Sequence, residues 1–377
     1  MNTVLKKQME HHLQGTAKSW RIRQRFMTWI LLLTFCIIAL GITAEGSQYK
    51  IETLGSLGTG YARSRAIGGD GTVVGESSVS GALRPFLWNN GHMTDIATLG
   101  GINGKALAVN ATGVSAGWAQ NSSGVYKPVV WDSYGIHELQ TLGGLSGQVQ
   151  AINDNLQAVG YSYISQSYYH AALWQGGSIV DLGTFGGGYS TAYSINTQGD
   201  IVGSAYDINK KETACIWENN IPQRLPGLSG GTWSAAKGIN DAGQIILWGD
   251  LFNGACHAAL YDNGQIKDLG TLGGRESWAY GLNNNGVVVG SADLPGGNYH
   301  AFVYDGTGIS DLGTLGGYYS IAFGINDAGV IVGAAQTDTG QWEATRWTLV
   351  PEPESIIVLM TGIVGFIGKR RKIFNHL

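Results

Sequence analysis

Apolar and polar residues alternate over short stretches along most of the chain, which is the pattern of half-buried β-strands. Residues 265–304 show the pattern clearly, with candidate strands at Gln265–Leu269, Ser277–Leu282, Val287–Gly290 and Tyr299–Tyr304. Gly-rich and Asn-Gly segments separate them, and Gly and Asn tolerate the positive φ angles of tight turns. Four short strands within about 40 residues are typical of one propeller blade.

This unit recurs seven times, and three landmarks share its spacing. The Thr position of a Leu-Gly-Thr-Leu-Gly-Gly motif falls at Ser56, Thr98, Thr141, Thr184, Gly227, Thr271 and Thr314. An aromatic residue ends each last strand, at Trp88, Trp131, Trp174, Trp217, Tyr261, Tyr304 and Trp347. An Asn after an apolar residue opens a turn at Asn110, Asn153, Asn196, Asn240, Asn283 and Asn326, with Gly68 in the first copy. A common period of about 43 residues establishes the repeat.

The two ends of the array complement each other. Tyr49–Leu54 is a first strand with no last strand before it, and Gln341–Thr348 is a last strand with no first strand after it. Pairing them closes a ring and removes the exposed sheet edges. We therefore predict an all-β fold, a seven-bladed β-propeller of four-stranded blades. A signal helix is expected before it and a sorting helix after it.

Composition supports this fold and excludes others. The chain of 377 residues contains 59 Gly, 7 Pro and 12 Trp, and only 13% of its residues are charged. The glycines follow no triplet period, which excludes collagen. The three cysteines include no Cys-x-x-Cys pair, so neither a disulfide scaffold nor a zinc site is expected. We expect Cys215 and Cys256 to be free thiols.

The N-terminus has the pattern of an export signal. Basic residues up to Arg25 precede an apolar run from Trp29 to Ile42, and Ala44 follows. A basic region, a short apolar region and a small residue are typical of a secretory signal peptide. We assign residues 1–44 to it, with cleavage at Ala44. A retained anchor is the alternative, although the run is shorter than a bilayer requires.

The C-terminus, residues 349–377, combines three elements: Pro351-Glu352-Pro353, an apolar stretch from Ile356 to Gly368, and a basic end that includes Arg370-Arg371. This arrangement resembles the PEP-CTERM sorting signal of exported proteins in Gram-negative bacteria. The resemblance implies an exosortase as membrane partner, insertion through this segment, and then transfer to the cell surface or release. Its hosts typically make exopolysaccharide.

The body between the signals is acidic. Residues 45–350 contain 13 Lys and Arg against 24 Asp and Glu, a net charge of −11. Nucleic-acid binding requires clustered basic residues, so we expect no nucleic-acid partner. A strongly anionic polysaccharide suits this body equally poorly.

The repeats of residues 45–348 also resemble the HAF repeat, named for a His-Ala-Phe step. His300-Ala301-Phe302 matches fully, and the Asp-Leu-Gly-Thr-Leu-Gly-Gly element is complete at 268–274 and 311–317. The remaining copies match in part or keep only the position. The resemblance implies an extracellular bacterial protein. Members of this family have no assigned activity, so the resemblance indicates location and not mechanism.

Several recurrent polar residues could suggest chemistry. An acidic residue recurs at Asp95, Glu138, Asp181, Asp268 and Asp311. We expect these carboxylates to accept hydrogen bonds from the adjacent Gly-rich turns, because a Ca²⁺ site needs six to eight converging oxygens. The Asn-Asp-Ala-Gly segments at 240–243 and 326–329 are expected to be hairpin turns. His170, His257 and His300 occupy equivalent positions in separate repeats with no carboxylate at a fixed spacing, so structural roles are expected. We predict no catalytic, cofactor-binding or metal-binding residues.

Aromatic residues outside the repeat pattern are the better binding candidates, since sugar rings stack on such side chains. They are Trp118, Tyr163, Tyr168, Tyr169, Tyr189, Trp233, Trp248, Tyr299, Tyr318 and Tyr319. The fifth copy is irregular, with Leu247-Trp248 where the other copies have a Gly. Such an irregularity marks either a site or drift.

The sequence therefore predicts an exported, non-catalytic interaction protein of the cell surface or extracellular matrix. Its partners would be exopolysaccharide or other surface glycans. A carbohydrate-binding propeller is the alternative function, and a propeller hydrolase is less favoured because no carboxylate pair or nucleophile stands out.

Overall fold

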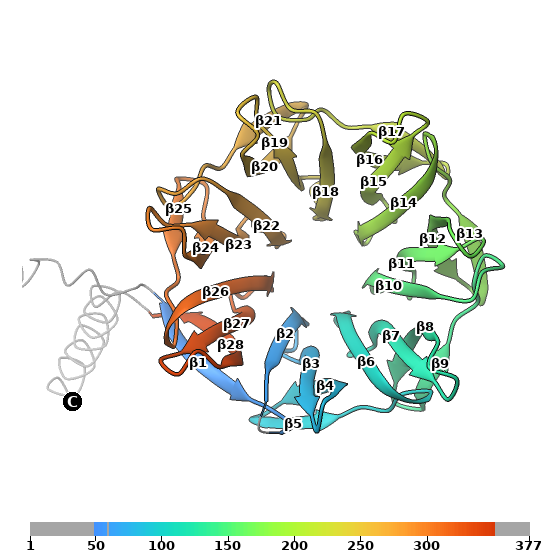
Figure 1. Ribbon diagram of the computed structural model, residues 1–377, viewed down its shortest axis with the longest axis horizontal. Helices are drawn as coiled ribbons and strands as arrows, with labels where there is room; N and C mark the ends of the chain where they lie inside the picture. Colours follow the sequence, from blue (N-terminus) through green and yellow to red (C-terminus); the bar gives the residue numbers. More distant parts are fainter. Residues whose placement is uncertain (1–48, 59, 351–377) are drawn as a thin grey trace, which may run out of the picture. The chain divides into compact units, whose positions relative to one another are not determined.

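The computed structural model describes residues 49–58 and 60–350, and this part is all-β, with 28 strands and no helix long and apolar enough for a bilayer. The strands form five four-stranded sheets and one eight-stranded sheet. The sheets stand around a common axis like blades (Figure 1). The all-β prediction is confirmed, whereas the expected terminal helices, Ala44 and the 351–371 sorting residues lie outside the described residues.

Each sheet has the same strand order from the axis outward. The inner strands are β2 (Ala62–Ile67), β6 (Gly100–Val109), β10 (Gly147–Ile152), β14 (Gly186–Ile195), β18 (Ser234–Ile239), β22 (Ser277–Leu282) and β26 (Gly316–Ile325). The second strands are β3 (Val73–Val79), β7 (Ser115–Asn121), β11 (Ala158–Tyr163), β15 (Ile201–Asp207), β19 (Ile245–Asp250), β23 (Val288–Asp293) and β27 (Ile331–Thr337). The third strands are β4 (Ala82–Asn89), β8 (Tyr126–Asp132), β12 (Tyr169–Gln175), β16 (Glu212–Glu218), β20 (Cys256–Asp262), β24 (Tyr299–Tyr304) and β28 (Trp342–Leu349). The outer strands are β5 (His92–Asp95), β9 (Gly135–Glu138), β13 (Ser178–Asp181), β17 (Ile221–Arg224), β21 (Gln265–Asp268), β25 (Ile309–Asp311) and β1 (Tyr49–Gly55).

The eight-stranded sheet consists of two such units. Strands β10–β13 and β14–β17 are each antiparallel, and a single parallel pairing of Tyr169 with Tyr189 joins them. The merger is therefore local, and the four-stranded pattern continues through it.

The predicted closure is confirmed. Strand β1 pairs antiparallel with β28, from Tyr49 opposite Leu349 to Thr53 opposite Thr345. Arg346 on β28 also forms an ion pair with Glu52 on β1, at 2.8 Å between Nη2 and Oε2. The first strand of the described chain thus completes the last sheet, which leaves no unpaired β28 edge.

The hydrophobic core lies between neighbouring sheets. The recurrent aromatic at the end of each third strand is buried in six copies, and only Tyr261 is partly exposed. In four copies the indole N–H donates across to the preceding sheet, as in Trp131 to the Ala97 carbonyl at 2.7 Å. A buried indole needs such an acceptor, so these residues both fill the core and join the sheets.

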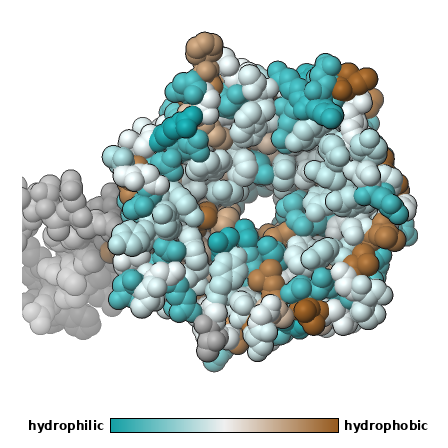
Figure 2. Space-filling view, in the orientation of Figure 1, coloured by the Kyte–Doolittle hydropathy of each residue, from teal (hydrophilic) through white to brown (hydrophobic). Residues whose placement is uncertain are grey.

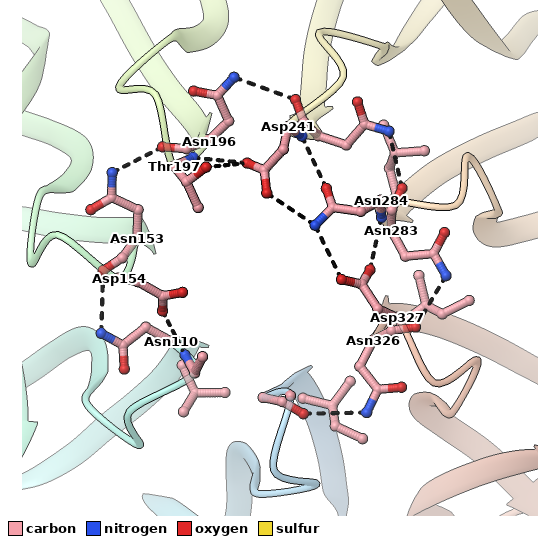
Figure 3. A pocket seen from close by; sticks show the side chains of 18 of the residues that line it. Asn110, Asn153, Asp154, Asn196, Thr197, Asp241, Asn283, Asn284, Asn326 and Asp327 are labelled. Atoms are coloured by element: carbon pink, nitrogen blue, oxygen red, sulfur yellow. Dashed lines mark hydrogen bonds between the residues drawn. The ribbon is translucent and has the colours of Figure 1, made fainter.

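One asparagine per repeat joins the inner strands around the axis. Its Oδ1 accepts backbone N–H groups of its own turn, as Asn240 does from Ala242 and Gln244. Its Nδ2 donates to the carbonyl of the equivalent Asn in the next sheet, and Figure 3 shows these amides pointing from strand to strand. The six bonds, between 2.9 and 3.3 Å, start from Asn110, Asn153, Asn196, Asn240, Asn283 and Asn326. We call this series the asparagine relay.

The relay has one gap, at Gly68. Its carbonyl accepts from Asn326, but glycine has no side-chain amide that could donate to the Asn110 carbonyl. Asp70 takes over the turn, since its Oδ1 accepts the Thr72 N–H at 2.9 Å. The first sheet therefore keeps the turn and lacks the link to its neighbour.

We predict that Asn240→Ala lowers the free energy of unfolding by about 2–3 kcal/mol, because buried turn groups and the Asn283 carbonyl lose their partners. Asn240→Asp keeps the turn acceptor but places a carboxylate against that carbonyl, so it should cost at least as much. Asn121 accepts from Ser123 and Val125 in an equivalent turn between β7 and β8. Asn121→Ala is thus the control, with an expected loss of about 1 kcal/mol. Urea denaturation measures all three, and equal losses for Asn240→Ala and Asn121→Ala would contradict a role in joining sheets.

Candidate binding site at the ring axis

A β-bulge interrupts every inner strand at the same position, three residues before the relay position. The register with the second strand shifts there in each sheet, as between Ser64 and Ala66 on β2. A bulge re-aims the extra side chain. The bulge residues are Arg65, Leu107, Gln150, Tyr193, Lys237, Tyr280 and Phe323. We call them the bulge ring.

A glycine on the second strand accommodates each bulge. At Gly75 an added Cβ would lie 2.0 Å from the Arg63 carbonyl oxygen, and five other copies are equivalent at 1.9–2.0 Å. No side chain fits there, so the glycines are a backbone requirement. The fifth copy has buried Leu247 at this position instead.

The bulge ring and its neighbours form a continuous series of side-chain contacts over much of the ring. Lys237 Nζ lies 3.0 Å from the Tyr193 ring centroid and 4.3 Å from that of Trp248. The Trp248 and Tyr280 rings are 5.2 Å apart. The contacts continue from Tyr280 to Phe323 at 5.3 Å and from Phe323 to the Arg65 guanidinium at 4.4 Å. The irregular fifth copy thus supplies Trp248 to this series. Figure 2 shows that the ring is open at its centre.

Arg65 forms an ion pair with a buried carboxylate that a second cation, Lys105, also approaches. Fully buried Glu76 accepts from Arg65 Nε at 2.8 Å and Nη2 at 2.5 Å and from the Tyr61 hydroxyl at 3.1 Å. Lys105 Nζ is 3.9 Å from Glu76 Oε1. Burial and then Glu76 raise the pKa of Tyr61 to about 12. Burial lowers the pKa of Lys105, and Arg65 and Arg63 lower it further against the opposing effect of Glu76.

Lys237 is the second unusual cation. Burial lowers its pKa to about 7, while Glu212 acts in the opposite direction. The faces of Tyr193 and Trp248 also favour the ammonium form. The Glu212 carboxylate itself accepts from Ser204 at 2.6 Å and from Tyr206 at 2.9 Å.

A cluster of tyrosines lies at the end of the axis where the inner strands begin, opposite the relay. Tyr163 marks that end, because its N–H donates to the Ser146 carbonyl just before β10. Ring centroids 4.9–6.2 Å apart, in tilted or edge-to-face pairs, connect Tyr161, Tyr163, Tyr168, Tyr169, Tyr189 and Tyr206. Tyr168 is 49% exposed and the others are partly exposed. The pair Tyr299–Tyr319, at 4.7 Å, occupies the equivalent place between β24 and β26. We call this surface the aromatic face.

The opposite end of the axis carries a cavity of about 290 Å³ lined by the relay turns (Figure 3). Asp154, Asp241 and Asp327 face it, but each accepts the backbone N–H of the preceding sheet's turn, at 2.8–3.0 Å. Asn284 also donates to both Asp241 and Asp327. These carboxylates therefore act as links between sheets. In the described part of the chain, no three His, Cys, Asp or Glu side chains form a metal-binding group.

The structure corrects one sequence interpretation. A carboxylate does lie at a fixed spacing from each histidine, eleven residues on: His170, His257 and His300 pair with Asp181, Asp268 and Asp311 at 2.8–3.0 Å. Arg84–Asp95 and Lys127–Glu138 repeat the pattern. The strand pairing, not proximity in sequence, brings the partners together. Such exposed pairs contribute little to the stability of the fold, roughly 0–1 kcal/mol each. The two partners of a pair share one sheet, and the three histidine pairs lie on three different sheets.

Other predictions are confirmed. Three of the five recurrent carboxylates, Asp181, Asp268 and Asp311, accept the N–H of Gly183, Gly270 and Gly313 in the adjacent turns, whereas Asp95 and Glu138 pair with Arg84 and Lys127. The Asn-Asp-Ala-Gly segments are turns between inner and second strands. Cys215 and Cys256 are free and buried. Of the aromatic candidates, Tyr163, Tyr168, Tyr169, Tyr189, Tyr299 and Tyr319 lie on the aromatic face. Trp248 contacts the bulge ring, and Trp118 meets Tyr126 edge to face. The bulge ring itself was missed, although a variable residue between two small ones before each apolar-Asn pair marks it.

No family model and no curated protein matches the chain. Solved structures do match. The β-propeller domain of the trilobed protease from Pyrococcus furiosus, with an open velcro topology, is 14% identical, with a TM-score of 0.55 over 78% of this chain and 96% of that one. A puromycin-hydrolysing peptidase from Mycobacterium tuberculosis is 13% identical, with a TM-score of 0.50 over 76% of this chain and 52% of that one. At such identities the likeness shows the fold alone, which is a β-propeller.

Lys237 should make stability depend on pH. The folded state holds its proton less tightly than the unfolded chain, so the destabilisation is fully present below the folded pKa and disappears as the pH rises toward the unfolded value. Lys237→Met should therefore raise the free energy of unfolding by roughly 2 kcal/mol at pH 6 and less at pH 9. Lys267→Met is the control, because Lys267 also lies over a ring, Tyr304, but on outer strand β21. Guanidinium denaturation at both pH values measures the difference. A gain that is equal at pH 6 and pH 9 would show that Lys237 is not desolvated in the folded state.

Proposed function

We propose that this chain is an exported interaction protein of the cell surface or extracellular matrix, built as a seven-bladed propeller, and that it binds surface glycans without catalysing a reaction. The blade count takes the two halves of the eight-stranded sheet separately. The observation that carries the proposal is the aromatic face, where partly exposed tyrosines contact one another with tilted rings on the side where the inner strands begin.

The aromatic face suits carbohydrate for a physical reason. Apolar sugar faces pack on aromatic rings, while hydroxyl groups need polar partners nearby. The tyrosine rings offer both. Burial, and then Tyr163 and Tyr169, raise the pKa of Tyr161 to about 12, so the Tyr161 hydroxyl stays protonated at neutral pH. The rings also support one another, so little side-chain entropy remains to be lost on binding.

The engagement of the acidic groups favours binding over catalysis. Arg65, Tyr61 and Lys105 surround the Glu76 carboxylate, and Ser204 and Tyr206 donate to Glu212. A general base must be free to take a proton from substrate. Neither carboxylate is placed for this in the described part of the chain.

Export rests on the two terminal signals. Residues 1–44 carry the basic and apolar parts of a secretory signal, and residues 349–377 carry the Pro-Glu-Pro motif, the apolar segment and the basic end. In this proposal an exosortase-type enzyme recognises the open backbone that the prolines impose. The protein is held in the membrane before sorting and is then transferred to the cell surface or released.

Replacing Pro351 and Pro353 together with Ala should block sorting, because the open backbone before the apolar segment is lost. We expect an uncut, membrane-associated form in cell fractions, and loss of the protein from the surface. Pro295→Ala, in the turn between β23 and β24, is the control and should leave sorting intact. Mass spectrometry of the surface form reads the outcome, and recovery of an intact C-terminus up to Leu377 from wild-type protein would refute the proposed processing.

Glycan binding is tested with an array of neutral and acidic oligosaccharides followed by calorimetry. Tyr168→Ala removes the most exposed ring of the tyrosine cluster, and we expect its affinity to fall at least tenfold, which corresponds to about 1.4 kcal/mol. Tyr134 is 91% exposed but lies in the turn between β8 and β9, so Tyr134→Ala is the matched control. Absence of binding to any glycan, or equal loss in both variants, counts against the proposal. Turnover of a bound glycan counts against its non-catalytic part.

A further inference from the structure

The inner strands β2 and β6 bring together more positive charge than the carboxylate paired with it neutralises. Arg63, Arg65 and Lys105 lie together on β2 and β6, and Glu76 is the one carboxylate that the structure pairs with this group. The Glu76 carboxylate accepts hydrogen bonds from two nitrogens of Arg65 and so neutralises that guanidinium. Two positive charges therefore remain at this place, in a body with a net charge of −11. We call Arg63, Arg65 and Lys105 the cationic sector.

Arg63 is the member of the sector whose partner is missing. Its Nε is buried and has no hydrogen-bond acceptor. Its guanidinium lies 4.7 Å from the Tyr61 ring centroid and 5.0 Å from that of Trp342. These rings lie beside the guanidinium but give its Nε no hydrogen-bond acceptor. A buried N–H without an acceptor costs about 1–3 kcal/mol, and it is commonly explained by an ion or ligand that the site binds.

The three cations act on the same small volume. Both Arg65 and Arg63 lower the pKa of Lys105, and Arg63 also acts on Tyr299 at the neighbouring part of the aromatic face. Because the repulsion among the cations is only partly compensated by Glu76, an additional anion would relieve it. Partial burial makes that attraction stronger than at an exposed surface.

The neighbourhood of the sector also limits the ligand. Tyr61 and Trp342 stand beside Arg63, and the Tyr299–Tyr319 pair lies close by. A free inorganic ion would leave these rings unused. An anionic group attached to a sugar ring would use both, with the charge at the cations and the ring against an aromatic face.

We propose that the cationic sector binds the anionic substituent of an acidic saccharide, such as the carboxylate of a uronic acid residue. This rests on the proposed function and gives it a ligand class. It also revises the expectation that an anionic polysaccharide suits this protein poorly. That expectation was drawn from the net charge of the whole body, which does not determine the charge at the cationic sector. A planar carboxylate suits the guanidinium fork, as Arg65 already shows with Glu76.

The test titrates the purified protein, by calorimetry, with a tetrasaccharide of alternating glucose and glucuronic acid. The same tetrasaccharide with its carboxyl groups reduced to alcohols is the matched neutral ligand, and inorganic phosphate is the probe for a free anion. We expect the acidic tetrasaccharide to bind at least tenfold more tightly than the neutral one. The advantage should shrink between 20 and 500 mM NaCl, because salt screens the attraction.

Two variants connect this preference to the sector. Arg63→Gln removes the unpaired cation and leaves the Arg65–Glu76 pair in place. It should abolish the preference for the acidic ligand without changing affinity for the neutral one, and its melting temperature shows whether the fold persists. Arg63→Lys keeps the charge but not the planar fork and should retain only part of the preference. Arg84→Gln is the control. Arg84 lies on third strand β4 and pairs with Asp95, so this variant should bind both ligands as the wild type does.

The outcomes separate the two proposals. If both tetrasaccharides bind equally and Arg63→Gln changes nothing, the cationic sector is not the anion site, while glycan binding stands. If phosphate binds as tightly as the acidic tetrasaccharide and depends equally on Arg63, the site recognises a free anion and the saccharide assignment is wrong. If neither tetrasaccharide binds and the array is also silent, the proposed function itself fails.

Discussion

The side-chain amide of an asparagine, present in six of the seven repeats, is the contact on which the geometry of the ring depends. Neighbouring sheets of a propeller share no regular backbone ladder, so their spacing must come from packing and from individual polar contacts. Here each Asn both fixes its own turn and reaches the carbonyl of the next Asn, 43 or 44 residues further along the chain. One residue thereby fixes both the conformation of its turn and the contact to the next sheet, so the turn and the neighbouring sheet cannot shift independently.

With the inner strands fixed at one end, the bulge can vary the surface of the channel without disturbing the scaffold. The glycine opposite each bulge admits the inner-strand carbonyl, and the small residues on either side of the bulge leave room for the neighbouring sheet. Only the bulge side chain differs freely, from Arg65 to Leu107 to Phe323. At the level of the bulges, the side chains that face the axis are therefore different residues from the relay asparagines that join the sheets.

This separation explains what could be predicted from the sequence. The repeat, the four strands of each copy, the turns and the closure of β1 on β28 depend on local patterns that recur in register, so they were readable. The histidine–carboxylate pairs were missed because their constant eleven-residue spacing becomes a contact only through the register between the third and outer strands, which the repeat pattern does not specify. The bulge ring was missed because its residues share a position but no chemistry, and sequence reasoning looked for shared chemistry. Tyr169 and Tyr189 were recognised as candidates, whereas their gathering on one face follows from the common direction of the inner strands.

The gap at Gly68 gives an otherwise cyclic ring a seam. The series of amides has a first donor, Asn110, and a last acceptor, Gly68, and the joint between β2 and β6 lacks the contact that the other joints have. The cationic sector spans this same joint, since Arg63 lies on β2 and Lys105 on β6. A ligand anion held between them would act as a staple across the seam. Binding of the anion would then increase the resistance of the whole ring to mechanical opening. Without the anion, the ring would open first between β2 and β6, where the anion binds.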